Sequence, residues 1–296
     1  MNDRLNQLAL FARTVETGSF SKTAREFRLS QPSVSRAIST LEARLGVALL
    51  HRTTRRITPT DAGQALALSA RDALTAIDDA ENAARGEDRL SGVLRVSLPT
   101  AFGVRVVIPR LAGFLALRPE LKIELMMSDR FDDLVAEGAD LALRLGNQPD
   151  SAFLTRKLTS APRIVVASPD YLQRRGAPAN LADLARHDCL GGPGDSDRTG
   201  WTFQHDGRQE NVAVEFRIRT GSGAGVATCA AAGLGVAVVS VWMCEEELRD
   251  GRLVRILRDY RLPPVDAHVV FTSGSRPSRK ARAFSDYLAA ALNALA

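Results

Sequence analysis

Long apolar runs are missing from this sequence of 296 residues, and none of its apolar stretches could cross a membrane. The first ten residues mix Asn, Asp and Arg with Leu, so they lack the apolar block of a secretory signal. The hydrophobic fraction of 45% and the charged fraction of 25% match an ordinary soluble protein. We therefore expect a cytoplasmic protein with ample material for a core.

Cysteine and histidine are also scarce. Cys189, Cys229 and Cys244 are odd in number and widely spaced, which excludes a disulfide framework or a metal-ligand doublet and favours reduced, partly buried thiols. No GxSxG, HExxH or phosphate-binding loop occurs. We expect no metal, no cofactor and no catalytic residues. The histidines are scattered without metal-ligand spacing: His51, His187, His205 and His268.

Positive charge is concentrated at the N-terminal end. Residues 1–60 hold ten Lys or Arg and four Asp or Glu, a net charge of +6 in a chain whose total is +5. The remaining residues are therefore close to neutral. A compact basic module beside a neutral body is typical of a nucleic-acid-binding protein.

The basic module has the pattern of three short helices and a hairpin. Gly18 ends the first helix, Ser19 or Ser21 caps the second, and a third helix extends from Ser30 to Gly46. Arg-rich residues 49–58 then favour a short hairpin, or wing, although the turn lacks Gly or Asn. The apolar stripe predicted for the third helix is Val34, Ile38, Leu41 and Leu45.

The opposite face of the third helix carries short hydroxyls and one Arg, which suit the major groove of double-stranded DNA. Arginines of the wing would contact phosphates or the minor groove. The alternative is an ordinary solvated face, which the concentration of positive charge makes the weaker interpretation. The predicted DNA-binding residues are Ser30, Gln31, Pro32, Ser33, Ser35, Arg36, Ser39, Thr40, Arg52, Arg55 and Arg56.

An alanine-rich helix is predicted from Thr60 to about Arg85, with Leu66, Leu74 and Ile77 among its apolar residues. A long amphipathic helix between two domains usually needs a partner, so we expect it to pair with its copy in another subunit. The alternative is a helix packed on its own chain.

Strands and helices alternate from Gly92 onward, which predicts an α/β body with largely parallel sheets. The expected strands are residues 93–98, 121–125, 140–145, 163–167, 212–218, 235–240 and 265–272. The expected helices are residues 103–117, 169–175, 222–232 and 278–292.

The N-terminal motif resembles the helix-turn-helix of LysR-type transcriptional regulators. The resemblance is carried by residues 17–24 (TGSFSKTA), 29–38 (LSQPSVSRAI), 41–46 (LEARLG) and 56–63 (RITPTDAG). Residues 92–96, 140–146 and 232–237 are similar to recurring stretches of the family's effector domain, so the resemblance covers essentially the whole chain. Within the family, the chain is most similar to the CrgA-like subgroup.

The resemblance implies a winged helix-turn-helix at 1–60, a linker and dimerisation helix at 61–89, and an effector domain at 90–296 built like a periplasmic binding protein. Lobe I would comprise residues 90–161 and 267–296, and lobe II residues 162–266, with two crossings between them. The implied partners are promoter DNA with dyad symmetry, a small effector, further copies of the chain as a homodimer or homotetramer, and RNA polymerase as an additional candidate.

Two short segments are expected at the effector site because ligands of open α/β sheets lie beyond the carboxyl ends of strands. Thr100 and Ser222 each stand between a strand and a helix, where hydroxyls and free N–H groups favour an anion. The alternative is that both are simply helix caps. The resemblance adds Ser128, Arg144, Gly146 and Phe203, of which Arg144 is equally well explained as a structural ion-pair partner.

Two departures from the family pattern lie near this expected site. Gly221 stands where many relatives have Asn, and Ser240 where many have Pro, so the identity of the effector is not carried over. Two other classes of protein were weighed. An α/β enzyme would need a nucleophile and base that the motifs do not supply, and a solute-binding module would need export.

Overall fold

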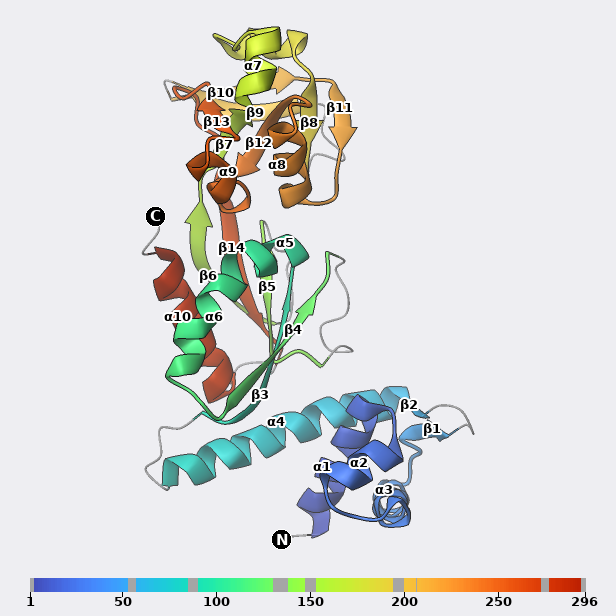
Figure 1. Ribbon diagram of the computed structural model, residues 1–296. Coiled ribbons are helices and arrows are strands. Elements are labelled where there is room, and N and C mark those ends of the chain that lie inside the picture. Colours follow the sequence, from blue (N-terminus) through green and yellow to red (C-terminus); the bar gives the residue numbers. More distant parts are fainter. Residues whose placement is uncertain are drawn as a thin grey trace.

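The structure is a computed structural model that describes residues 3–52, 57–84, 90–129, 138–146, 153–193, 200–205, 207–272 and 277–293 (Figure 1). An N-terminal helical domain lies at one end, a long helix crosses beneath the body, and two α/β lobes follow one another away from it. In these ranges, no helix is both long and apolar enough to span a bilayer.

The N-terminal domain has the three predicted helices, α1 (Asp3–Thr17), α2 (Phe20–Glu26) and α3 (Gln31–Leu45). Ser19 caps α2, Ser30 caps α3, and Gly46 ends α3 at a φ of 70°. The strands β1 (Leu50–Arg52) and β2 (Ile57–Pro59) pair antiparallel, which confirms the hairpin.

The core of this domain contains Val34, Ile38 and Leu41, as predicted, together with Leu10 and Phe11 of α1. The prediction for Leu45 was wrong, because its side chain is 42% exposed. Leu45 occupies the last turn of α3, beyond the part of the helix that packs on α1.

The linker helix α4 (Asp61–Ala84) begins where the sequence predicted. The Thr60 hydroxyl accepts the N–H of Gly63 at 3.0 Å and donates to the carbonyl oxygen of Ala48 at 2.9 Å. A Cβ at Gly63 would lie 2.0 Å from the carbonyl oxygen of Leu49, so only glycine allows this close approach. The joint between the hairpin and α4 is therefore tightly packed.

Lobe I is a five-stranded sheet in the order β4-β3-β5-β14-β6. Its helices, including α10, cover one face, where Phe102, Phe114 and Phe284 pack on the strands. The strands are β3 (Gly92–Leu98), β4 (Leu121–Met127), β5 (Leu141–Leu145), β6 (Leu154–Ala161) and β14 (Val265–Phe271). The helices are α5 (Thr100–Phe102), the π-helix η1 (Gly103–Val107), α6 (Ile108–Ala116) and α10 (Arg279–Asn293).

Lobe II is a second five-stranded sheet, in the order β11-β8-β12-β7-β13, with a separate hairpin of β10 and β9. Helix α8 packs on one face, and α7, η2 and the hairpin pack on the other. The strands are β7 (Arg163–Ala167), β8 (Cys189–Gly191), β9 (Gly200–His205), β10 (Arg208–Ala213), β11 (Phe216–Arg219), β12 (Val236–Ser240) and β13 (Val254–Ile256). The helices are α7 (Pro169–Arg175), η2 (Leu181–Arg186), α8 (Gly223–Ala231), η3 (Val241–Met243) and α9 (Glu245–Arg249).

The sheets are mixed, so the prediction of largely parallel sheets was wrong. Strand β14 runs antiparallel to β5 and β6, and β12 and β13 run antiparallel to β7. One strand is reversed in each lobe, and in both cases it is a strand that follows a crossing of the chain: β7 is the first strand of lobe II, and β14 is the strand that returns to lobe I. The single strand expected over 212–218 is two strands, β10 and β11, that belong to different sheets. Strand β14 starts at Val265, two residues before the expected return to lobe I.

The lobes also meet through side chains, in addition to the two crossings. Trp242 and Met243 of η3 are buried in the hydrophobic core of lobe I. The Trp242 ring packs edge-on against Phe102, with centroids 5.4 Å apart. Arg105 of η1 forms two 2.8 Å hydrogen bonds with the carboxylate of Glu247 in α9. This apolar and ionic contact holds the lobes together on the α5 side.

Candidate DNA-binding surface and sensor site

Helix α3 presents its polar face to solvent. Gln31, Pro32 and Arg36 are exposed on the side of α3 opposite to the buried stripe. The Ser30 hydroxyl accepts the N–H of Ser33 at 3.2 Å, so it caps the helix whatever else it contacts. Of the remaining predicted residues on α3, Ser33, Ser39 and Thr40 are exposed and Ser35 is half-buried. This face can therefore approach a double helix without moving the core.

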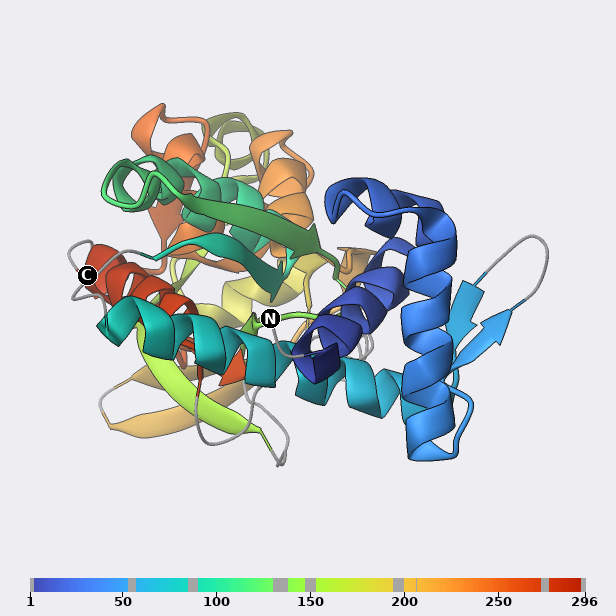
Figure 2. The same ribbon diagram turned by 90° about the horizontal axis from the view of Figure 1, so that it is seen from below.

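The hairpin is attached firmly to α3. The Glu42 carboxylate accepts the backbone N–H groups of Leu49 and Leu50 at 2.9 and 3.2 Å. Figure 2 shows α3 and the hairpin side by side at the outer edge of the molecule. Arg52 lies in β1, and its side chain is outside the described part, as are Arg55 and Arg56. These bonds fix the position of the hairpin relative to α3.

A chain of ion pairs joins the helical domain to lobe I. Arg13 binds Glu26 of α2 at 2.5 Å and Glu16 of α1 at 2.7 Å. Glu16 also accepts a 3.0 Å bond from Arg95 of β3, which in turn contacts Glu124 of β4 at 2.7 Å. The hydrogen bond to Glu26 is the main cause that raises the pKa of Arg13.

The carboxyl ends of β3, β4 and β5 meet at the edge of lobe I that faces lobe II. Thr100 follows β3 at the start of α5, with an exposed side chain, and its N–H donates to Asp129 Oδ1 at 3.0 Å. Ser128 follows β4 and is half-buried. The parallel pairing of β3 with β4 therefore brings Thr100 and Ser128 to one edge, together with Asp129, which the sequence did not single out.

Ser222 occupies the matching position in lobe II, before α8. Its hydroxyl accepts the N–H of Gly225 at 3.4 Å, and the Thr220 hydroxyl donates to the Ser222 carbonyl oxygen at 2.7 Å. Ser222 is therefore a helix cap, as the alternative interpretation held. A cap hydroxyl that is half-exposed keeps an unused lone pair for a ligand.

Arg144 and Gly146 lie on and after β5. The Arg144 side chain is only 7% exposed and donates to Ser97 Oγ at 3.2 Å and to the Leu143 carbonyl oxygen at 3.0 Å. Gly146 has a φ of 78°, and its N–H binds the Asp266 carbonyl oxygen. Arg144 is thus fixed in the sheet, next to the carboxyl end of β3.

Phe203 was a wrong choice for a ligand contact. It lies within β9, has no exposed surface, and packs in the core of lobe II against Tyr260, with ring centroids 6.2 Å apart. The expected cleft loop is a strand, because β9 pairs with β10 across its whole length.

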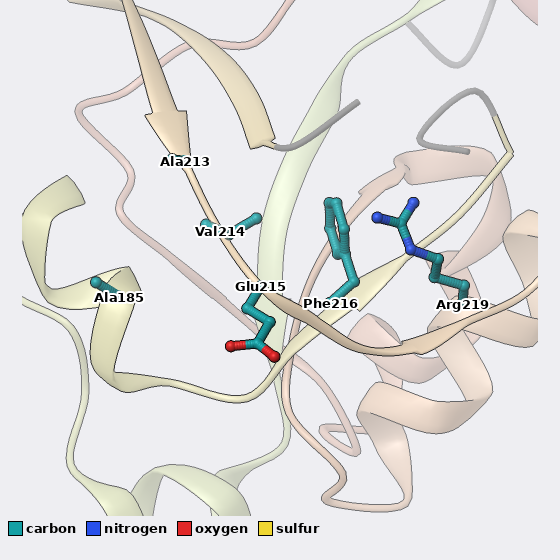
Figure 3. A pocket seen from close by; sticks show the side chains of 6 residues that line it. All are labelled: Ala185, Ala213, Val214, Glu215, Phe216 and Arg219. Carbon is teal, nitrogen blue, oxygen red and sulfur yellow. The ribbon is translucent and has the colours of Figure 1, made fainter. Parts of the chain in front are cut away.

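A surface hollow of about 570 Å³ lies on lobe II (Figure 3). Phe216 and Arg219 form one side of it, with the guanidinium 4.6 Å from the ring centroid. Glu215 points away from both. None of the predicted effector residues lines this hollow.

Comparison with known proteins identifies the family. Residues 5–64 match the bacterial regulatory helix-turn-helix of the lysR family, and residues 87–293 match the LysR substrate binding domain. The chain therefore belongs to the LysR family of transcriptional regulators, with a DNA-binding helix-turn-helix and an effector-binding domain, and is not an enzyme.

Individual relatives align with this chain along almost their full lengths. The regulator PtxR of Pseudomonas aeruginosa is 33% identical over 96% of this chain and 91% of its own. The structure of CrgA from Neisseria meningitidis is 27% identical, with a TM-score of 0.62 over 97% of this chain and 98% of its own. The full-length virulence activator AphB of Vibrio cholerae is 29% identical, with a TM-score of 0.58 over 96% and 98%.

Proposed function

We propose that this regulator binds a dyad-symmetric operator by inserting α3 into the major groove, with the β1–β2 hairpin against the backbone. The observation that carries this proposal is the exposed polar face of α3, with Arg36 at its centre, on a domain that holds the chain's excess positive charge. A helix-turn-helix dimer mirrors its own two-fold symmetry in its operator. The proposed division is a DNA-binding domain at 1–60, a linker at 61–89 and an effector domain at 90–296.

The test is Arg36→Ala in a binding assay with DNA from the upstream intergenic region. We expect the variant to lose about 1–3 kcal/mol of binding free energy and to have a relaxed preference for the base that Arg36 contacts. Arg55→Ala is expected to weaken binding to all DNA sequences alike and to make the affinity less dependent on salt concentration. Arg249→Ala, an exposed arginine of lobe II, is the matched control. Unchanged affinity and specificity in Arg36→Ala would remove α3 from the role of recognition helix.

We also propose that a small organic anion is the effector and that Thr100 and Ser222 contact it from the two lobes. Support comes from the meeting of strand ends with helix starts at both positions, where backbone N–H groups and hydroxyls favour an anion. Ser128, Arg144 and Gly146 lie at or near the same edge of lobe I. An anion that prefers one arrangement of the lobes would re-space the paired DNA-binding domains.

A thermal-shift screen of aliphatic and aromatic carboxylates tests this site. A bound carboxylate is expected to raise the unfolding midpoint of the unmodified protein, and to raise it less in Thr100→Val and in Ser222→Ala. Glu245→Gln is the control, since Glu245 is exposed on α9. A carboxylate that stabilises both variants as strongly as the unmodified protein would place the effector site elsewhere.

The third part of the proposed function is self-association of the protein. We infer a homodimer formed through α4, and a homotetramer when effector domains also associate, with RNA polymerase as a further partner at the promoter. A regulator of this design acts in the cytoplasm, where its operator is.

A further inference from the structure

A second hollow, of about 340 Å³, lies on lobe II between α7, β11 and the turn that follows α8. Its lining is strongly basic, and among the described residues that line it the one acidic side chain is that of Asp188. Three segments far apart in the sequence supply the charges. The basic residues are Arg174 and Arg175 of α7 and Arg217 of β11.

Each of these guanidinium groups is held by its own chain through one hydrogen bond. Arg174 donates to the Gly233 carbonyl oxygen at 2.9 Å, and Arg175 to the Arg186 carbonyl oxygen at 3.0 Å. Arg217 donates to Asp188 Oδ1 at 3.0 Å. A guanidinium has five N–H donors, and the described residues occupy one on each of these arginines. Most of the donor capacity around the hollow therefore remains for a ligand.

The backbone beneath the hollow is rigid. Gly233 has a φ of 74°, and a Cβ there would lie 3.1 Å from Arg174 Nη2, so glycine makes room for the guanidinium. The N–H of Asp188 donates to the Tyr171 hydroxyl at 2.9 Å, and its carbonyl oxygen accepts the N–H of Val236 at 2.8 Å. These contacts fix the backbone that carries Asp188 and Gly233.

We propose that this hollow binds a phosphate monoester, at a site separate from the one bounded by Thr100 and Ser222. A terminal phosphate has three peripheral oxygens that can meet guanidinium groups from several directions, whereas a carboxylate has two in one plane. Its charge near −2 at neutral pH matches three arginines less one aspartate. Leu234, which is 43% exposed, and Ile218 offer an apolar wall to the organic part.

Isothermal titration of the full-length protein with glycerol 3-phosphate tests the proposal, with glycerol and succinate as comparisons at equal ionic strength. We expect saturable binding of glycerol 3-phosphate, none of glycerol, and binding of succinate at least about tenfold weaker. Absence of saturable binding at millimolar glycerol 3-phosphate overturns the proposal. Equal or tighter binding of succinate also overturns it if Arg174→Gln weakens that binding, because the hollow would then be a site for dicarboxylates, whereas succinate binding that Thr100→Val weakens belongs to the effector site.

Variants of the lining residues test where glycerol 3-phosphate binds. Arg174→Gln and Arg217→Gln are each expected to weaken the binding of glycerol 3-phosphate by about tenfold or more. Asp188→Asn is expected to tighten this binding, because it removes the negative charge of Asp188 from the lining. Arg249→Gln, an equally exposed arginine outside the hollow, and Thr100→Val should leave the affinity unchanged. Equal losses in Arg249→Gln and Arg174→Gln, or weaker binding in Asp188→Asn, would contradict a built site. These outcomes at the hollow do not depend on whether a carboxylate binds between Thr100 and Ser222.

Discussion

Burial controls the chemistry of the cysteines. The side chains of Cys189 and Cys244 have no exposed surface, whereas Cys229 on α8 is half-buried. Burial, reinforced by the neighbouring Asp188, raises the pKa of Cys189 to about 12. Burial and the nearby Glu247 likewise raise the pKa of Cys244 to about 12. A thiol reacts as its thiolate, so neither group is poised for oxidation or alkylation.

We therefore expect iodoacetamide at pH 8 to label Cys229 at least about tenfold faster than Cys189 or Cys244 in the folded protein. Mass spectrometry of peptides from a time course measures the three rates. A Cys229→Ser variant isolates the two buried thiols, and denaturant should then expose them together. Labelling of Cys189 at the rate of Cys229 would contradict the burial described above.

At the scale of elements, the surroundings of α4 change along its length. Leu66 packs against the core of the helix-turn-helix domain, close to Gly63, whose tight contact with Leu49 fixes the start of the helix. Ile77 lies three turns further on and is half-buried. The two apolar residues are therefore expected to respond differently to a charge.

We expect Ile77→Glu to lower the oligomeric mass in light scattering and, with it, the affinity for DNA, while the unfolding midpoint changes little. Leu66→Glu is expected to destabilise the DNA-binding domain by about 2–4 kcal/mol, because it places a charge in a packed core. Ala76→Glu, about 100° round the helix from Ile77 and exposed, is the matched control. A monomeric unmodified protein at micromolar concentration would contradict pairing through α4.

At the scale of the whole molecule, the interlobe contact makes stability depend on pH. Burial disfavours the charged form of Glu247, but the hydrogen bonds from Arg105, a backbone hydrogen bond and the charges of Arg105 and Arg252 together outweigh it and lower the pKa of this carboxyl. A carboxyl with a lower pKa in the folded state stabilises the protein above its unfolded pKa, and this contribution is lost as the pH falls through the folded value.

Glu247→Gln is accordingly expected to lower the free energy of unfolding by about 1–3 kcal/mol at pH 7. The difference from the unmodified protein should shrink as the pH falls below about 4, where the carboxyl becomes protonated. Glu245→Gln is the control, because Glu245 pairs with Arg249 on the exposed side of the same helix. Chemical denaturation across this range measures both variants. A loss that is the same at every pH would show that packing, not charge, holds the lobes.

The sequence by itself determined the features that depend on neighbours within one or two helical turns. Helix α3 begins after Ser30 and ends at Gly46, because a capping residue forms its hydrogen bond with the backbone only three or four residues away. The buried stripe of α3 follows from the helical spacing of its apolar residues, and the family motif follows from the fixed spacing of its matching residues. The exposed face of α3 was therefore predictable, and so were the strand ends that carry Thr100 and Ser222.

Only the tertiary structure decided what depends on distant partners. Glu247 and Arg105 are 142 residues apart, and no local pattern links them. The family resemblance implied that Phe203 contacts the effector, yet its side chain is buried in the core of lobe II. Arg174 and Arg217 line one hollow although β7, which leads into α7, is separated from β11 by two strands of the sheet. Capping and periodicity are short-range interactions, whereas sheet order and burial are set by the packing of the whole chain.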